Sequence, residues 1–252
     1  MKSLTRFNLG LDRFSGLYMW ALFIVVFGIW TPQLFLSMAT LHSVASAQAI
    51  GAMVALAALI PIACGNYDLS IGAIVNFTAI LVTIFQVNER WNLWTAIIAA
   101  AVVGAVIGAV NGFIVVVLRV NSFIATLGTA TIITAVQTII TGGSQPLPIV
   151  NSTWVNLTQV QVGGFQIVVI YLVVVALLAW WLMDHTPMGR YFYAVGSNQE
   201  AARLSGVRVG KWSWLSLTLS GAICGIAGIF YASLYGPSLT FGSALLLSLI
   251  HI

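Results

Sequence analysis

Charge is what this sequence has least of. Only 6% of its 252 residues are Asp, Glu, Lys or Arg, whereas a soluble domain carries about 25%. This scarcity excludes an ordinary soluble fold. The formal net charge of +4 is therefore not a sign of nucleic-acid binding, because basic residues in a membrane protein mainly set its orientation.

Clusters of reactive side chains are also missing. The two cysteines lie far apart within apolar runs, and the three histidines are isolated near the ends of such runs. A phosphate-binding GxxxxGK[ST] loop is absent, since Gly210-Lys211 is followed by Trp212, and there is no HExxH motif. We therefore expect no metal site, no cofactor and no nucleotide hydrolysis by the chain itself.

Long apolar runs dominate what is present, and 60% of residues are apolar. Each run is near the ~20 residues that a helix needs to cross a bilayer, and helices satisfy their own backbone in lipid. The first run also resembles the apolar region of a signal peptide, but a matching cleavage site lies too far downstream. We predict an all-α polytopic transmembrane bundle: an N-terminal tail (1–16), then one membrane domain (17–252). The expected spans are 17–30, 43–64, 69–87, 93–118, 122–141, 163–183 and 213–235.

The basic residues are distributed unevenly among the segments between these spans. With the N-terminus inside, the outer segments hold only Arg90. By the positive-inside rule, the polar loop 184–212 is cytoplasmic and the segment 142–164 is external. The basic residues of the inner segments are Lys2, Arg6, Arg13, Arg119, Arg190, Arg203, Arg208 and Lys211.

The loop 184–212 carries the signals of a short helix. Ser197 or Asn198 can cap its N-terminus, Glu200 lies in the first turn, and Gly206 can end it. We predict a short cytoplasmic helix near 197–206.

Asp68 is the one carboxylate near the middle of the apolar sequence. A charge at the bilayer centre costs at least ~2.5–3.5 kcal/mol on insertion scales. Asp68 therefore either caps the following helix or contacts a permeating solute, and both roles can hold together.

Uncharged polar residues also lie within the spans or at their edges. Asn and Gln are costly in lipid and should face other helices or water, whereas a Thr hydroxyl can bond its own helix. A pathway lined by neutral hydrogen-bonding groups suits a neutral polyhydroxylated solute better than an ion. Candidate pathway residues are Asn66, Asp68, Ser70, Asn76, Asn111, Asn121, Phe123, Thr126 and Gln137.

Two of the spans carry glycines at intervals of four residues. This spacing puts small residues on one helix face, where it lets two backbones approach closely in lipid. We predict helix packing there, with a pathway-lining role left open. The glycines are Gly104, Gly108 and Gly112 in one span and Gly221 and Gly225 in the other.

Four stretches together resemble one family. Glu200-Ala201-Ala202, followed by Gly206, looks like the EAA loop of ABC importer permeases, and the surrounding GRxxxAVGSNxEAARLSGVxV resembles the ribose-type, sugar-importing branch. The stretch 67–72 (YDLSIG) is similar to that family's DLSxG motif. The stretch 122–129 (SFIATLGT) is similar to its PFIxTLGT segment, and 141–143 (TGG) matches the glycines that follow. The likeness runs from about 45 to 243. Gly65-Asn66 departs from the family's Gly-Gly, and Asn121-Ser122 stands where a proline is frequent.

The resemblance implies an inner-membrane permease subunit of a binding-protein-dependent ABC importer for a sugar. It implies three protein partners: a cytoplasmic ABC ATPase that hydrolyses ATP, a periplasmic sugar-binding protein, and a second permease copy in the lipid bilayer. Nucleic acid is not among them. The family continues beyond the position of Gly242 with further spans, so the resemblance also implies a chain truncated at its C-terminus. The implied ATPase-coupling residues are Gly189, Arg190, Asn198, Glu200, Ala201, Ala202 and Gly206.

Two alternatives stay open at this point. A branched-chain amino acid permease would share the fold, but its solute would favour charged or helix-end contacts. A membrane-embedded enzyme or scaffold would need His, Asp or Glu clustered at one membrane depth, which the sequence does not offer.

Overall fold

The computed structural model describes residues 11–242, with side chains from residue 15 onward. The rest of the predicted N-terminal tail and the chain end after Gly242 lie outside this range. Helices make up most of the described chain, and the division into two compact units falls between Ala45 and Ser46. The predicted all-α membrane bundle is confirmed. Five helices are long and apolar enough to cross a membrane, and two shorter apolar stretches, Ser15–Trp30 and Ile71–Val87, account for the other two predicted spans.

The first unit holds α1 (Leu11–Trp30), α2 (Pro32–Phe35) and the beginning of α3 (Met38–Ala63). Helix α1 begins six residues before the predicted span. Pro32 occupies the first turn of α2, where its missing N–H is not needed. The Phe27 ring lies 6.4 Å from that of Trp30 and 5.9 Å from that of Phe35, so aromatic contacts fix the turn between α1 and α2.

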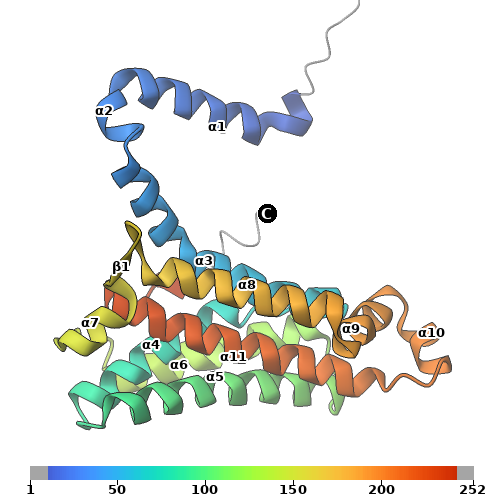
Figure 1. Cartoon of the computed structure of the whole chain (residues 1–252). Helices are drawn as coiled ribbons and strands as arrows, with labels where there is room; N and C mark the ends of the chain where they lie inside the picture. The colour runs from blue at the N-terminus through green and yellow to red at the C-terminus, as the bar shows by residue number, and fades with distance from the viewer. Residues whose placement is uncertain (1–10, 243–252) are drawn as a thin grey trace, which may run out of the picture. The chain divides into compact units, whose positions relative to one another are not determined.

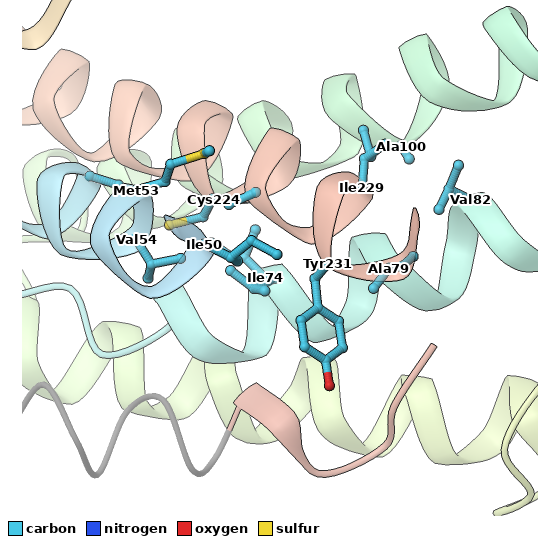
Figure 2. Close-up of a cluster of buried hydrophobic side chains, with 14 of the residues drawn as sticks. Ile50, Met53, Val54, Ile74, Ala79, Val82, Ala100, Cys224, Ile229 and Tyr231 are labelled. Atoms are coloured by element: carbon cyan, nitrogen blue, oxygen red, sulfur yellow. The ribbon is translucent and has the colours of Figure 1, made fainter. Parts of the chain in front are cut away.

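The second unit is a bundle built around one helix, α11 (Val209–Tyr235). Helix α11 is the most buried of the five long apolar helices. It packs along α4 (Ile71–Val87) and α5 (Leu93–Val116), with α6 (Ser122–Thr141) against α4 and α5 (Figure 1). Figure 2 shows the centre of the core, where Ile50 and Val54 of α3 lie near Ile74 of α4 and Cys224 of α11.

One interhelical segment holds structure that the sequence patterns did not predict. Residues 142–164 contain α7 (Ser152–Gln159), and a small hairpin of β1 (Gln161–Val162) and β2 (Phe165–Gln166) leads into α8 (Ile167–His185). The Asn151 side chain caps α7 by accepting from the Thr153 N–H at 2.9 Å. Trp154 is buried, and its carbonyl accepts from the Ser233 hydroxyl of α11 at 2.7 Å. The segment is therefore tied to the end of α11.

The polar loop 184–212 contains two helices rather than the single short one that was predicted. The predicted helix is present as α10 (Gln199–Leu204). Before it lies α9 (Pro187–Ser197), whose N-terminus is capped by the Thr186 hydroxyl, which accepts from the Met188 N–H at 3.2 Å. Thr186-Pro187 is a typical helix start, and this signal could have been used.

The basic residues of the second unit lie mainly at one end of the bundle. Helix α5 has 24 residues and so is about 35 Å long; Arg90 precedes it and Arg119 follows it. The end of α5 meets the start of α11, where a Cβ on Gly210 would lie 2.8 Å from Val116. Arg119 and the basic loop 190–211 therefore share one end, opposite the end that carries Arg90 (Figure 1).

Candidate functional site

A non-helical break, residues 64–70, separates α3 from α4. A break at membrane depth needs partners for its backbone, because lipid offers none. The Tyr67 N–H donates to the Ser122 hydroxyl, and the Leu69 N–H donates to the Thr126 hydroxyl, both at 3.0 Å. Ser122 and Thr126 stand in the first turns of α6. Two motifs that lie about 55 residues apart in the sequence are thus joined directly.

Asp68 lies buried at the centre of this break. Its Oδ1 accepts from the Ser70 N–H at 3.0 Å and from the Ser70 hydroxyl at 2.6 Å. Its Oδ2 accepts from the Ser220 hydroxyl of α11 at 3.0 Å. The Asn111 amide of α5 donates to the Ser70 hydroxyl at 2.8 Å. Asp68 and Ser70 together therefore link the start of α4 to α11 and α5 through hydrogen bonds.

This arrangement corrects the predicted capping role of Asp68. The carboxylate bonds the N–H of Ser70, the residue before α4, and not an N–H within the helix. Its other partner, Ser220, belongs to α11. A buried carboxylate needs hydrogen-bond donors, and the packing of α11 against the break supplies this one. Contact with a solute stays a prediction. Asp68 does border a groove of 1190 Å³ between α3, the break and α8.

A second buried polar contact joins α4 to α6. The side-chain amide of Asn76 donates a hydrogen bond to Oε1 of the Gln137 side chain at 3.4 Å. The Gln137 amide donates to the Leu239 carbonyl at 3.2 Å, and the Gly242 N–H donates to Asn76 Oδ1 at 3.2 Å. A Cβ on Gly72 would lie 2.2 Å from the Gly242 carbonyl oxygen. The segment after α11 thus folds back onto α4 and α6.

Most of the predicted pathway residues are internal. Asn121 and Phe123 are exposed, and the Asn121 side chain caps α6 by accepting from the Phe123 N–H at 2.9 Å. The structure places the others in the interior, and the side chains of all but Asn66 are hydrogen-bonded to another segment of the bundle. The buried residues are Asn66, Asp68, Ser70, Asn76, Asn111, Thr126 and Gln137.

An open groove lies beside them on the surface of α6, where apolar side chains surround one amide and three threonine hydroxyls. It has a volume of 480 Å³ and runs between α4, α6 and the segment at Leu239–Gly242. Thr131, Thr134 and Thr138 recur on one face of α6, and their hydroxyls donate to carbonyls of their own helix. Each hydroxyl oxygen can still accept a hydrogen bond. Asn76 lines the same groove. The three-and-four spacing of these threonines was the available signal.

The predicted coupling residues lie on α9 and α10. Asn198 caps α10 by accepting from the Ala201 N–H at 3.0 Å, and Ala202 is buried. Gly189 is buried in α9 and Gly206 ends α10 with φ +83°. Arg190, Glu200 and Ala201 are exposed, as is Leu204, at 82%. Helix α10 therefore presents a short surface with two opposite charges, Glu200 and Arg203, beside two apolar groups, Ala201 and Leu204.

The glycine-spaced faces of α5 and α11 meet each other. A Cβ on Gly104 would lie 2.7 Å from the Cα of Gly225. A Cβ on Gly108 would lie 2.4 Å from the Leu217 carbonyl oxygen, and one on Gly221 would lie 2.5 Å from the Gly104 carbonyl oxygen. A Cβ on Gly112 would meet Trp214. The structure places all five glycines between the two helices.

Comparison with known proteins agrees with this arrangement of motifs. The family described as "Branched-chain amino acid transport system / permease component" matches residues 40–252. The chain belongs to this permease family. It is 34% identical over 204 residues to the autoinducer 2 import system permease protein LsrC of Enterobacter sp. (strain 638). It is 30% identical over 222 residues to the L-arabinose transport system permease protein AraH of Escherichia coli (strain K12).

The permease relatives are longer than this chain. The LsrC match covers 80% of the chain and 58% of LsrC, and the AraH match covers 88% of the chain and 67% of AraH. No solved structure matches significantly. The motifs that meet at the α3–α4 break and the polar loop both lie within the matched range.

Proposed function

We propose that this chain is a membrane subunit of a binding-protein-dependent ABC importer for a neutral polyhydroxylated solute of the monosaccharide class. The α6 groove is the observation that carries the proposal. Among the described residues that line it, the polar side chains are an amide and three hydroxyls, with no charged group. A sugar hydroxyl can both donate and accept, so it complements threonine oxygens whose protons are already committed to helix carbonyls.

The nature of the groove weighs against the amino acid alternative. A zwitterionic solute carries two charges, and a desolvated charge needs an opposite charge or a helix end. Asp68 is the one carboxylate near this region, and its oxygens already accept from Ser70 and Ser220. The similarity to AraH, named as an L-arabinose permease, supports the sugar class.

The remaining parts of the proposal concern partners and orientation. We place the chain in the cell inner membrane with its N-terminus and the basic end of the bundle in the cytoplasm. A second permease copy completes the pathway, a periplasmic sugar-binding protein delivers the solute, and ATP is hydrolysed by a separate ABC ATPase. The ATPase contacts the exposed face of α10, with Glu200 and Leu204 at its centre.

Reconstitution tests the solute class. The chain is placed in proteoliposomes with the ABC ATPase and the solute-binding protein from the same genome, and uptake of radiolabelled L-arabinose, D-ribose and L-leucine is measured with ATP. We expect ATP-dependent uptake of a sugar. Thr134→Val should raise the KM for that sugar about tenfold, the cost of about one hydrogen bond. Thr129→Val removes a hydroxyl that bonds its own helix outside the groove and should leave KM unchanged. Uptake of leucine alone would establish the alternative.

A charge-reversing variant on α10 tests whether this helix couples the chain to the ATPase. Glu200→Arg reverses the charge on the exposed face of α10, so we expect the complex to assemble while ATP-driven uptake is lost. Glu89→Arg is the matched control, because it makes the same change of two charge units at an exposed glutamate away from α10. Normal uptake in Glu200→Arg proteoliposomes would refute the coupling role.

A further inference from the structure

A second hydrophobic core joins the polar loop to the end of α3. It contains Ile60 of α3, Cys64 directly after α3, and Phe192, Val195 and Ala202 of α9 and α10. All five are buried, with Phe192 and Val195 fully inaccessible. Helices α9 and α10 are therefore packed onto the membrane bundle next to the α3–α4 break.

At the edge of this core, two backbones come into contact at the exposed glycines Gly65 and Gly196. A Cβ on Gly196 would lie 2.1 Å from the Ala63 carbonyl oxygen and 3.1 Å from the Gly65 nitrogen. A Cβ on Gly65 would lie 3.4 Å from the Cα of Gly196. Gly65 has φ +79°, which only glycine adopts readily. At Gly196 the chain of α9 thus lies directly on the first residues of the break.

The other side of the break is held by the bundle. Tyr67 and Leu69 are bonded to α6, and Asp68 is bonded to α11. Pro61 lies in the last turn of α3, where it removes one helix hydrogen bond and favours bending. The break therefore has a proline-bent entry, an exit that is hydrogen-bonded to the bundle, and one close contact with α9.

Close-packed backbone atoms transmit displacement because there is no side chain between them to rearrange. A shift of α10 carries α9 with it, since Ala202 and Val195 share one core. The atoms of Ala63 and Gly65 must then move with Gly196. Because the two backbones are in direct contact, a shift of α9 by a fraction of an ångström is enough to strain the hydrogen bonds of the break.

We propose that Gly65 and Gly196 form the junction through which movement of α10 reaches the α3–α4 break. They are positioning residues for solute transfer, and Gly196 matters because any side chain there would push the break away from α9. This role rests on the proposed function. The contact itself does not, and it is tested separately.

Hydrogen–deuterium exchange of the chain alone in lipid nanodiscs tests the contact. Gly196→Ala should speed exchange of the Asn66, Tyr67 and Leu69 amides at least tenfold. Gly128→Ala is the control, because a Cβ there meets nothing within 4 Å. Unchanged exchange at these amides would overturn the junction.

A gentler pair of variants serves if Gly196→Ala does not accumulate in the membrane. Val195→Ala and Val168→Ala each remove two methyl groups from a fully buried valine, the first in the core beside the break and the second in the main core. Only Val195→Ala should speed exchange at residues 66–69. Equal effects of the two variants there would overturn the junction.

The reconstituted importer tests the role in transfer. Gly196→Ala should keep ATP hydrolysis and lower the solute transported per ATP at least tenfold, while Gly128→Ala matches the wild type. A parallel fall of hydrolysis and uptake, or an unchanged ratio, would overturn the role. If the wild type shows no ATP-driven uptake, the proposed function fails and the role fails with it, while the exchange experiment still judges the contact.

Discussion

The hydroxyl of Thr126 offers the sharpest test of how the α3–α4 break is held. It is fully buried, donates to the Ser122 carbonyl at 2.8 Å and accepts from the Leu69 N–H at 3.0 Å. Thr126→Val keeps the shape of the side chain and removes only the hydroxyl. The Leu69 N–H then loses its acceptor in a place that lipid and helices surround.

The expected loss follows from that one orphaned donor. Leaving a buried N–H without a partner costs about 1–3 kcal/mol, more than the net value of an average hydrogen bond. Thr129→Val is the matched control, because the Thr129 hydroxyl only donates to the Ala125 carbonyl of its own helix at 3.0 Å. That change should stay within about 0.5 kcal/mol. Thr126→Ser keeps the hydroxyl and should lose only the buried methyl group, about 0.8 kcal/mol.

Equilibrium unfolding by SDS in mixed micelles measures these differences, with the fluorescence of the nine tryptophans as the signal. We expect the order wild type, Thr129→Val, Thr126→Ser and Thr126→Val, from most to least stable. Equal midpoints for Thr126→Val and Thr129→Val would show that the break does not depend on this hydroxyl, and the explanation of the motif at 122–129 would then be wrong.

Three further changes use the same chain. Gly108→Ala places a Cβ within 2.4 Å of a carbonyl oxygen of α11 and should lower the stability by about 1–3 kcal/mol or more in the SDS titration. Gly128→Ala, with open space around it, should leave the stability unchanged or raise it by up to about 1 kcal/mol. Equal effects of the two variants would contradict the close α5–α11 contact. Asp68→Ala deprives two hydroxyls and a backbone N–H of their acceptor and should lower the stability by about 2–4 kcal/mol. Asp68→Asn should lower it less, because one acceptor oxygen remains. A larger loss for Asp68→Asn than for Asp68→Ala would show that charge outweighs hydrogen bonding there. Asn198→Ala removes the cap of α10 and should speed amide exchange in its first turn by an amount equivalent to about 1 kcal/mol without moving the global midpoint, and a large shift of the midpoint would contradict a local role.

The presence of the membrane helices could be predicted because hydrocarbon thickness requires about 20 residues for each span, although the observed lengths range from 17 residues in α4 to 27 in α11. The expected range 122–141 coincides with α6, and 69–87 differs from α4 by two residues at one end. The short helix α10 was also predictable, since its cap residues act on their own backbone. Span length and helix caps depend on residues that are neighbours in the sequence, so both can be predicted from a single sequence.

Pairings between distant residues could not be predicted. An asparagine in an apolar run needs a partner, but the sequence does not say whether that partner is a solute or another helix. Asn111 bonds Ser70, and Gln137 bonds Asn76 and a backbone carbonyl, so these partners lie within the bundle, while a role of these residues in a solute pathway stays a prediction. Helix α7 was missed for a similar reason: its stability depends on contacts with Ser233, about 80 residues away.

The contact between α5 and α11 limits which parts of the bundle can move. Gly104, Gly221 and Gly225 bring the two backbones together with no side chain between them, so neither helix can slide or rotate past the other without a clash. We therefore expect the pair to move as a single rigid body. Helix α8 is the least buried of the five long apolar helices, and the polar surface of α6 is open. An opening and closing pathway would use the freedom of these outer helices, with the α5–α11 pair as the fixed frame against which they shift.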